Sequence, residues 1–494
     1  MIKLVERAQK FRNRIAIISD GNSFTYDQLL HDSAHFAQVL LGDGVDLHEQ
    51  PIGILVNPGY EYVKAQWAVW RAGGTAVPIH PKAPISSIEY IFKDTGLVQI
   101  IVQEELLNTV QSLAMGSNVR LVGLNEKAGA PYSLPNVESG RRAMILYTSG
   151  TTGNPKGVVT THSNIEAQVS CLVDFWQWTE EDHIINVLPL HHVHGIINVL
   201  SCALWSGAVC EFMPFDAEKV FKRIASKEVN LFMAVPTIYY KLITYWEECD
   251  ENTKAALSEG LKNMRLMVSG SAALPVSVLE KWKSISGHIL LERYGMTEIG
   301  MAVSNSYEGD RIPGHIGKPL PNVELKLVDE EGNEVSRGED GEIWVKGPSV
   351  FKEYWKREEA TRDAFSEDGW FKTGDIAIVN EGNLKIVGRS SVDIIKSGGY
   401  KLSALEIEEV IRKHPSIKDC GVVGIEDEEW GEIVAAALIP NEDDIDLEAF
   451  KEWMKGNLSS YKIPRKIKIL EDLPRNAMGK VVKKELKKDF KDIS

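Results

Sequence analysis

A segment rich in hydroxyl groups and glycine carries the residue types that bind a polyphosphate. It reads LYTSGTTGNPKG over Leu146–Gly157, and its polar and glycine members are Thr148, Ser149, Gly150, Thr151, Thr152, Gly153 and Lys156. Glycine backbone amides approach an anion closely because no Cβ intervenes, and an ammonium group adds positive charge. A P-loop needs the pattern GxxxxGK[ST], whereas Pro155 precedes Lys156 here and Gly157 follows it. The segment therefore predicts a phosphate-binding loop of another kind.

Further blocks of polar residues and glycine follow along the chain. They read RYGMTE, GWFKTGD, GRSSVDIIKSGGYKLSALEIE and PRNAMGK, at Arg293–Glu298, Gly369–Asp375, Gly388–Glu408 and Pro474–Lys480. With the first segment, in this order and at about this spacing, they resemble the signature of the adenylate-forming superfamily. Acyl-CoA synthetases, firefly luciferase and the adenylation domains of peptide synthetases belong to that superfamily. The resemblance covers essentially the whole chain.

The resemblance implies a site for ATP and Mg²⁺, with the phosphate-binding loop on the β- and γ-phosphates. In RYGMTE it places the Tyr294 ring on the adenine, the Thr297 hydroxyl on the α-phosphate and the Glu298 carboxylate on Mg²⁺. Asp375 would accept hydrogen bonds from the two ribose hydroxyls, assisted by Arg389. The adenine-side loop of the superfamily is matched by Gly270, Ser271 and Ala272.

The implied reaction has two steps, with ATP and CoA as co-substrates. A carboxylic acid attacks ATP to give an acyl-adenylate and pyrophosphate, and CoA then takes the acyl group as a thioester. The resemblance makes Lys480 the catalytic lysine of the first step, where an ammonium can neutralise charge between the carboxylate and the α-phosphate. Relatives then rotate the C-terminal domain about a hinge, which here falls within 390–393. That rotation presents the thioester loop, matched here by Gly398, Gly399, Tyr400 and Lys401.

The residue before YGMTE indicates which acid is activated. Arg293 suits a second carboxylate, because a guanidinium can bind a carboxylate through two parallel hydrogen bonds. In PLHHVHG, His192 matches the adenylation histidine of the superfamily, and His194 occupies a position that is often aromatic. The alternative interpretation is that Arg293 pairs with Glu292 or another acid and that the histidines are packed polar residues. The wider blocks resemble malonyl-CoA synthetases, which predicts ligation of malonate to CoA.

Two other functions are compatible with the same blocks. A medium- or long-chain fatty acid–CoA ligase would share them, although Arg293 argues against it. A stand-alone adenylation enzyme that loads a carrier protein would also share them, because the thioester loop does not distinguish CoA from carrier-bound phosphopantetheine. No obligate protein partner is inferred.

The composition argues against several other classes. The net charge of 55 − 70 = −15 disfavours a nucleic-acid binder that relies on bulk electrostatics. The 5 cysteines lack CxxC spacing, which favours a reducing compartment and no metal cluster. The N-terminus lacks the apolar core of a secretory signal, and no run of about 18 apolar residues suggests a transmembrane segment. We therefore expect a cytoplasmic protein.

The elements that must position these blocks alternate between strands and helices. Apolar runs such as Ile52–Val56 predict strands, and the spacing in Tyr26–Leu41 predicts an amphipathic helix. The alternation predicts an α/β N-terminal domain over 1–389, with layered, mainly parallel sheets and a small β-rich subdomain within 323–388. A smaller, mobile α+β C-terminal domain over 390–494 carries the lysine and the thioester loop. At 494 residues, more than one domain is expected.

Overall fold

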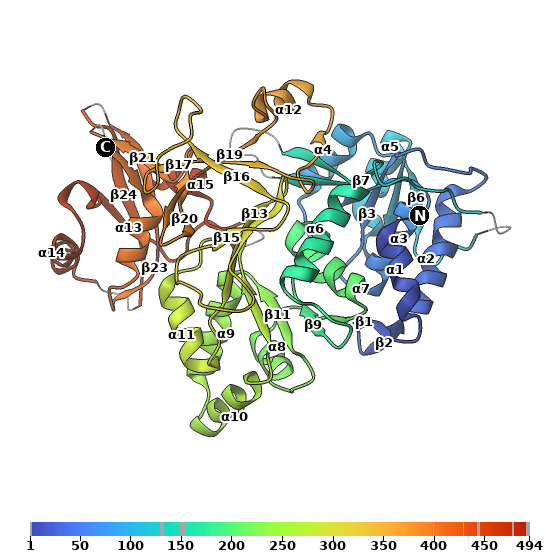
Figure 1. Ribbon diagram of the computed structural model, residues 1–494, viewed down its shortest axis with the longest axis horizontal. Helices are drawn as coiled ribbons and strands as arrows, with labels where there is room; N and C mark the ends of the chain where they lie inside the picture. The colour runs from blue at the N-terminus through green and yellow to red at the C-terminus, as the bar shows by residue number, and fades with distance from the viewer. Residues whose placement is uncertain are drawn as a thin grey trace.

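The computed structural model describes residues 2–128, 133–148, 155–398, 400–427, 429–441, 445–476 and 479–490. Within them the chain forms layers of sheet and helix, followed by a smaller C-terminal domain (Figure 1). The N-terminal helices lie at one end of the molecule in that view, and the C-terminal domain lies at the other. No helix among the described residues is long and apolar enough to cross a membrane.

The first large sheet carries the ends of the predicted phosphate-binding loop. Its strands are β3 Pro51–Leu55, β4 Thr75–Pro78, β5 Gln99–Val102, β6 Arg120–Gly123, β7 Arg142–Thr148, β8 Lys156–Thr161 and β18 Glu353–Tyr354. They follow the order β18-β8-β7-β4-β3-β5-β6, in which β7, β4, β3, β5 and β6 are parallel neighbours. β7 and β8 pair antiparallel, with Thr148 opposite Lys156, so both flanks of the loop are fixed at one edge of the sheet.

The second large sheet is also mainly parallel, as predicted. Its strands are β1 Ile15–Ser19, β2 Asn22–Thr25, β9 His183–Asn186, β10 Val209–Phe212, β11 Leu231–Ala234, β12 Leu266–Ser269, β13 Leu291–Met296, β14 Gly300–Ser304 and β15 Lys318–Pro319. They follow the order β15-β14-β13-β12-β11-β9-β10-β1-β2, and the run from β13 to β1 is parallel. β11 and β12 are buried along their whole length, which agrees with their unbroken apolar sequence.

Helices cover the faces of these two sheets. Their bounds are α1 Lys3–Ala8, α2 Tyr26–Leu41, α3 Tyr60–Arg71, α4 Ile85–Thr95, α5 Leu107–Ser117, α6 His162–Phe175, the π-helix η3 His194–Ser201, α7 Cys202–Ser206, α8 Ala217–Ile224, α9 Pro236–Glu248, α10 Glu251–Leu261, α11 Val276–Ser286 and α12 Glu358–Ala364. The helix predicted over 26–41 is α2. Thr25 and Gln28 form its capping box, and Leu29 and Phe36 bury its apolar face in a core shared with both sheets.

A four-stranded antiparallel sheet forms the predicted β-rich subdomain. Its strands are β16 Glu324–Val328, β17 Asp340–Lys346, β19 Phe371–Asn380 and β20 Asn383–Arg389. Its apolar side joins a core with Val303 of β14 and Phe351. This sheet lies between the two large sheets and the C-terminal domain in Figure 1.

The C-terminal domain has its own sheet and core. Its elements are β21 Ile394–Ser397, β22 Tyr400–Ser403, α13 Ala404–Ile411, β23 Ile417–Asp427, β24 Gly431–Pro440, α14 Leu447–Asn457, β25 Lys466–Ile469 and α15 Lys483–Leu486. Ser403 caps α13 by accepting a hydrogen bond from the Glu406 backbone N–H at 3.1 Å. Contacts between this domain and the rest of the chain include the Val276 N–H, which donates to Glu409 Oε1 at 3.2 Å, and Lys401 Nζ, which donates to Glu330 Oε1 at 2.7 Å.

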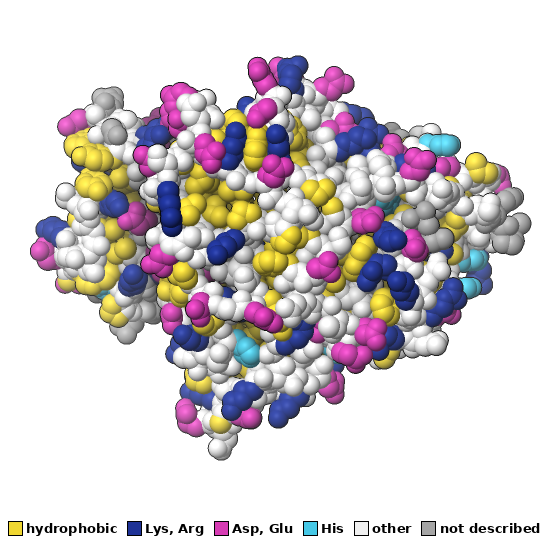
Figure 2. Space-filling view, in the orientation of Figure 1, with side chains coloured by type: hydrophobic (Ala, Val, Ile, Leu, Met, Phe, Trp, Pro, Cys, Tyr) yellow, Lys and Arg dark blue, Asp and Glu magenta, His cyan; other side chains and the backbone are white. Residues whose placement is uncertain are grey.

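Charged side chains of both signs are interspersed over the face of the molecule shown in Figure 2. On that face, lysine and arginine do not form an extended stripe of the kind that follows a nucleic-acid backbone. The visible surface therefore gives no support to a nucleic-acid-binding function.

Candidate active site

The central parallel strands of the nine-stranded sheet end together where several predicted site residues lie. Ala234, Ser269 and Glu292 are aligned across β11, β12 and β13. Ser271 lies two residues after Ser269, just beyond the end of β12. Arg293 follows Glu292 within β13. Ligands of open α/β sheets bind outside the carboxyl ends of the strands. The register therefore places these residues where a ligand is expected.

Asp375 joins two other predicted nucleotide-binding residues in one hydrogen-bonded cluster. It lies in β19 opposite Arg389 of β20, whose Nε donates to Asp375 Oδ1 at 2.8 Å. The Tyr294 hydroxyl donates to Asp375 Oδ2 at 2.7 Å. Burial lowers the pKa of Arg389, but the adjacent Asp375 carboxylate raises it by more, so the guanidinium stays charged. The cluster therefore holds a carboxylate in a fixed orientation, as the binding of two ribose hydroxyls would require.

Tyr354 connects Glu298 with Lys156. Its hydroxyl donates to Glu298 Oε1 at 3.0 Å, and Lys156 Nζ lies 4.9 Å from the centroid of its ring. Burial raises the pKa of Glu298, and the hydrogen bond from Tyr354 acts against that rise. Thr297, which precedes Glu298, is only partly buried. The phenol lies between the cation and the carboxylate without cancelling either charge.

A single carboxylate, rather than a cluster, is available here for a divalent cation. Among the described residues, no group of three or more His, Cys, Asp and Glu side chains could hold a metal ion. Glu298 is buried, and the hydrogen bond from Tyr354 uses one of its two oxygens. Mg²⁺ in nucleotide-binding sites is typically held by one or two carboxylates together with substrate phosphates and water. Glu298 therefore fits a Mg²⁺ that is bound largely by phosphate oxygens.

Parts of the two predicted loops fall outside the described residues, namely Ser149, Gly150, Thr151, Thr152, Gly153 and Gly399. For the phosphate-binding loop, the flanking residues are fixed. Thr148 and Lys156 pair across β7 and β8, and the Tyr90 hydroxyl of α4 donates to the Pro155 carbonyl at 2.8 Å. Both ends of that loop are thus anchored to regular structure.

The described residues of the thioester loop lie at the β21–β22 hairpin on the surface of the C-terminal domain. Gly398 has φ +56° and packs on Trp430 so closely that an added Cβ would lie 2.6 Å from the indole. Tyr400 stacks on Tyr461 with ring centroids 4.7 Å apart, and Lys401 is exposed. A side chain at Gly398 would therefore displace the hairpin.

Arg293 is a buried guanidinium without an acidic partner among the described residues. Only 4% of the residue is exposed, and burial lowers its pKa to about 9. Its Nη2 donates to Ser271 Oγ at 3.2 Å, and that Oγ lies 3.1 Å from His194 Nδ1. Within the same described set, Arg293 Nε and His194 Nε2 have no hydrogen-bond partner. Because buried unpaired polar groups are costly, an anion bound here would relieve both deficits.

Two neighbours of Arg293 explain this geometry. Glu292 accepts a hydrogen bond from the Gly314 N–H at 3.0 Å, and successive side chains of a strand point to opposite faces. The alternative pairing of Arg293 with Glu292 is therefore wrong. Gly270 lies against the guanidinium, since an added Cβ would be 2.6 Å from Arg293 Cζ. The Ser271 side chain faces the guanidinium, and the assignment of 270–272 to the adenine stays a prediction.

The histidines of PLHHVHG are packed and neutral. The His191 ring stacks on His80 with centroids 4.4 Å apart and lies 4.2 Å from the ring of His192. Burial lowers the pKa of His191 to about 2 and that of His192 to about 4, and it also lowers the pKa of His194 well below its ordinary value. Neutral imidazoles donate and accept hydrogen bonds without adding charge. Arg293 thus remains the cation of this pocket.

Lys480 lies on an exposed loop that touches the N-terminal domain. Its backbone N–H donates to Asn476 Oδ1 at 3.0 Å. The preceding Gly479, with φ +73°, packs on Thr237 so closely that an added Cβ would lie 2.5 Å from its Oγ1. Thr237 lies in the first turn of α9, the helix that follows β11. The lysine loop therefore meets the same sheet edge as the pocket of Arg293.

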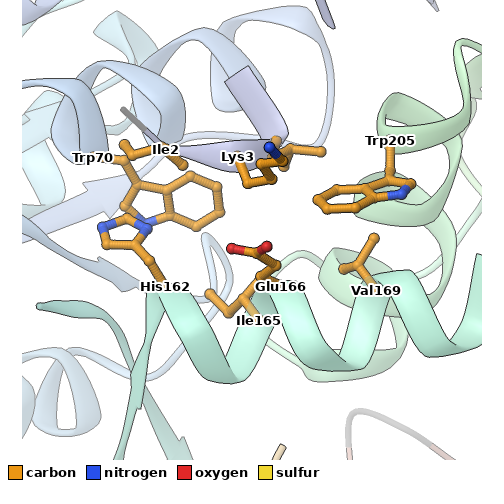
Figure 3. Close-up of a pocket in the computed structure, with 9 residues that line it drawn as sticks. Ile2, Lys3, Trp70, His162, Ile165, Glu166, Val169 and Trp205 are labelled. Carbon is orange, nitrogen blue, oxygen red and sulfur yellow. The ribbon is translucent and has the colours of Figure 1, made fainter. Parts of the chain in front are cut away.

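A separate small hollow lies between α1 and α6 (Figure 3). It is lined by residues that include Ile2, Lys3, Trp70, His162, Glu166 and Trp205. Its volume of about 20 Å³ suits roughly one water molecule. None of the predicted site residues lines it, so it is not the place where the substrates meet.

Tyr354 and His80 belong to the site but could not be identified from the sequence. Tyr354 lies 56 residues from Glu298 in the chain, in a short edge strand, and no local pattern marks the pair. His80 follows β4 and reaches the histidines only through the packing of the two sheets. The one available signal was a tyrosine in FKEYW directly before a helix, which is too common to identify a partner.

Known proteins share this arrangement. The sequence profile described as AMP-binding enzyme matches residues 4–355, and the profile described as AMP-binding enzyme C-terminal domain matches residues 406–480. The chain belongs to the AMP-binding enzyme family. One relative, the mitochondrial malonate–CoA ligase ACSF3 of Mus musculus, is 45% identical over 526 residues, which cover 98% of this chain and 90% of the relative.

Solved structures extend the comparison within the AMP-binding enzyme family. ATP-bound MatB from Rhodopseudomonas palustris matches with a TM-score of 0.92 and 31% identity, covering 100% of this chain and 99% of MatB. The apo form of the same protein matches with a TM-score of 0.81 over the same shares of the two chains. The structure is thus closer to the ATP-bound form of that relative than to its apo form.

Glu292 gives a pH-dependent test of how this site is built. Burial raises its pKa from 4.5 to about 8, the Gly314 hydrogen bond lowers it, and the nearby Glu409 raises it. Between pH 4.5 and about pH 8 the folded protein binds more protons than the unfolded chain, so the free energy of unfolding falls as the pH rises. Glu292→Gln cannot titrate. We expect it to remove a slope of up to about 1.36 kcal/mol per pH unit between about pH 5 and 7.5.

Urea unfolding of wild type and Glu292→Gln at several pH values measures this slope. The variant should gain stability over wild type as the pH rises, with little difference near pH 5. Glu105→Gln, at an exposed glutamate, serves as the matched control and should follow wild type. Parallel curves for Glu292→Gln and wild type would contradict the prediction.

Proposed function

We propose that this protein is an AMP-forming acid–thiol ligase that converts malonate, ATP and CoA into malonyl-CoA, AMP and pyrophosphate. The observation that carries the choice of acid is the buried Arg293 guanidinium, which has no acidic partner among the described residues. A dicarboxylate can place one carboxylate there and present the other to ATP. The malonate–CoA ligase that is 45% identical along nearly the whole chain supports the same acid.

The first half-reaction joins the second carboxylate of malonate to the α-phosphate. Its oxygen attacks the α-phosphorus, and the bond to pyrophosphate breaks. We assign the segment 148–156 to the β- and γ-phosphates, Thr297 to the α-phosphate and the Tyr294 ring to the adenine. The Asp375 carboxylate, which accepts a hydrogen bond from Arg389 Nε at 2.8 Å, would also accept hydrogen bonds from the ribose hydroxyls. These groups orient ATP for attack and stabilise the charge that accumulates.

Glu298 is assigned to the Mg²⁺ that accompanies ATP. When bound, the ion neutralises phosphate charge and stabilises the leaving pyrophosphate. Tyr354 orients the carboxylate, and its ring holds Lys156 at 4.9 Å, so the two charges stay available to the ligand. His192, whose pKa is lowered to about 4, is neutral and can donate a hydrogen bond to the reacting carboxylate.

We place the domain boundary between 389 and 390. Residues 1–389 would bind ATP and the acid, and 390–494 would carry Lys480 and the thioester loop. Lys480 stabilises the charge between the carboxylate and the α-phosphate in the first half-reaction. A rotation about 390–393 then withdraws it and presents the loop at 398–401. There the CoA sulfur attacks the carbonyl carbon, and AMP leaves.

We further propose free CoA as the acceptor and a cytoplasmic location. The 5 cysteines are free thiols, which suits a reducing compartment. A fatty acid–CoA ligase would need an apolar acyl pocket, which the Arg293–Ser271–His194 group opposes. The loading of a carrier protein is the other outcome that an acceptor assay would reveal.

The test of the proposed function is a panel of acids assayed for pyrophosphate release with and without CoA. Malonate should be the best substrate among acetate, butyrate, octanoate, methylmalonate and malonate, and AMP should accumulate with malonyl-CoA in equal amounts. A preference for octanoate would instead identify the protein as a fatty acid–CoA ligase. ADP as the stoichiometric product would overturn the adenylate mechanism.

Lys480→Ala should separate the two half-reactions. Because the ammonium acts only while the acyl-adenylate forms, adenylation should be abolished, while supplied malonyl-adenylate and CoA still give thioester at a substantial rate. Malonate-dependent ATP–pyrophosphate exchange measures the first step, and thioester formation measures the second. Lys484→Ala, at the exposed lysine of α15, is the control and should behave as wild type. Equal loss in both steps would refute the alternation of domains.

Arg293→Ala should impair malonate selectively. Removing one partner of a desolvated charge pair typically costs about 2–5 kcal/mol, which corresponds to a loss of roughly thirtyfold to several thousandfold in kcat/KM. The kcat/KM for butyrate should fall little, because butyrate has no second carboxylate to bind the guanidinium. Arg293→Lys should recover only part, since an ammonium lacks the planar fork. The measurement is kcat/KM for malonate and butyrate in all three proteins, with KM for ATP as the internal control. Equal losses on both acids would make Arg293 structural.

A further inference from the structure

A chain of ion pairs begins beside the proposed hinge, in the core of the C-terminal domain. Its central group is Lys483 of α15, whose Nζ lies 2.7 Å from Asp393 Oδ1 and 2.8 Å from Glu408 Oε1. All three side chains are buried. Lys483 thus joins the segment after β20, the helix α13 and the C-terminal helix α15. An ammonium between two buried carboxylates is held tightly, since no water replaces a lost partner.

The chain of ion pairs continues from Glu408 toward the lysine assigned to adenylation. Arg412 lies 3.4 Å from Glu408 Oε2 through Nη2 and 3.2 Å from Asp419 Oδ1 through Nε. Arg475 pairs with the other oxygen of Asp419. Arg475 Nη1 also donates to the carbonyl of Gly479 at 2.7 Å. That carbonyl belongs to the peptide that leads directly into the assigned lysine.

At its other end the chain of ion pairs is fixed to the hinge. The Asp393 N–H donates to the Arg389 carbonyl at 2.8 Å, and the Arg389 N–H donates back to Asp393 Oδ2 at 3.1 Å. The Arg389 guanidinium in turn holds Asp375 of the nucleotide cluster at 2.8 Å. The ion pairs therefore extend from the residue beside that cluster to the loop of Lys480.

The members of this chain balance in charge and move together. The carboxylates are Asp393, Glu408 and Asp419, and the cations are Lys483, Arg412 and Arg475. Every member except Asp393 lies after the proposed hinge segment 390–393, so a rotation there leaves the pairs among Lys483, Glu408, Arg412, Asp419 and Arg475 intact. The position of the lysine loop relative to the hinge is then set by these side chains rather than by the exposed loop alone.

We propose that Lys483 and Arg475 are positioning residues for the adenylation half-reaction, which they serve by fixing the loop of Lys480 relative to the hinge. The inference rests on the proposed function. When the C-terminal domain is docked, Gly479 lies against Thr237. The ion pairs then fix where the Lys480 loop lies relative to the rest of that domain. The thioester step does not use the lysine, so it does not depend on its position.

The test compares Lys483→Met, Lys483→Arg and Arg475→Gln in both half-reactions. Malonate-dependent ATP–pyrophosphate exchange reports adenylation, and supplied malonyl-adenylate with CoA reports thioester formation. Misplacement of a catalytic group by about 1 Å can cost roughly 100-fold, so adenylation should fall by about that factor in Lys483→Met and by about tenfold in Arg475→Gln. Thioester formation should stay within about threefold, and Lys483→Arg should restore most of the adenylation rate. Lys484→Met, at the exposed neighbour, should match wild type.

The outcomes separate positioning from general stability. Equal losses in both half-reactions, or unchanged adenylation in Arg475→Gln, would overturn the inference. If Lys483→Met does not fold, Arg475→Gln decides, because its side chain is partly exposed and the Asp393–Lys483–Glu408 group stays complete. If wild type shows no exchange with malonate but does with another acid, the choice of malonate fails, and the ratio of half-reactions is then measured with that acid.

Discussion

A buried positive charge with no negative partner among the described residues is the feature on which the acyl pocket depends. A guanidinium taken out of water is destabilising unless other groups compensate, and here Arg293 has only the neutral Ser271 hydroxyl, which in turn contacts His194. Gly270 lies directly against the group, where any side chain would collide with it. The protein thus holds the cation ready before the ligand arrives, and a bound carboxylate gains interactions that the empty pocket lacks. Pre-organisation of this kind lowers the cost of ordering the site at the moment of binding.

The alternation of side chains along β13 lets one strand contribute to both of the proposed substrate sites. Arg293 faces Ser271 and His194, whereas the next residue, Tyr294, faces Asp375 and the nucleotide cluster. Because successive side chains of a strand point to opposite faces, the proposed acyl pocket and the proposed nucleotide site use residues that are adjacent in sequence. The other residues of the site come from different sheets and from the C-terminal domain. They converge because the parallel strands β11 to β13 end together and the smaller domain docks against that edge.

The sequence predicted the architecture well and the contacts unevenly. The helix over 26–41, the parallel strands and the β-rich region all appeared as expected, because their apolar periodicity and buried runs are local signals. Resemblance to a superfamily identified the blocks, and the structure brings Tyr294, Asp375 and Arg389 into one cluster. The hydrogen bond between Tyr354 and Glu298 could not be predicted, since partners far apart in the chain meet only through packing. The same holds for the buried ion pairs of the C-terminal domain, whose members look in sequence like ordinary surface charges.

The position of Glu409 has a consequence for the energetics of domain movement. This glutamate reaches from the C-terminal domain to the Val276 N–H, where it raises the proton affinity of the buried Glu292. The proposed rotation would carry Glu409 away and remove that contribution. Proton binding and domain position are then thermodynamically linked, and each must influence the other by the same free energy. Protonation of Glu292 would therefore favour the arrangement in which Glu409 lies beside it.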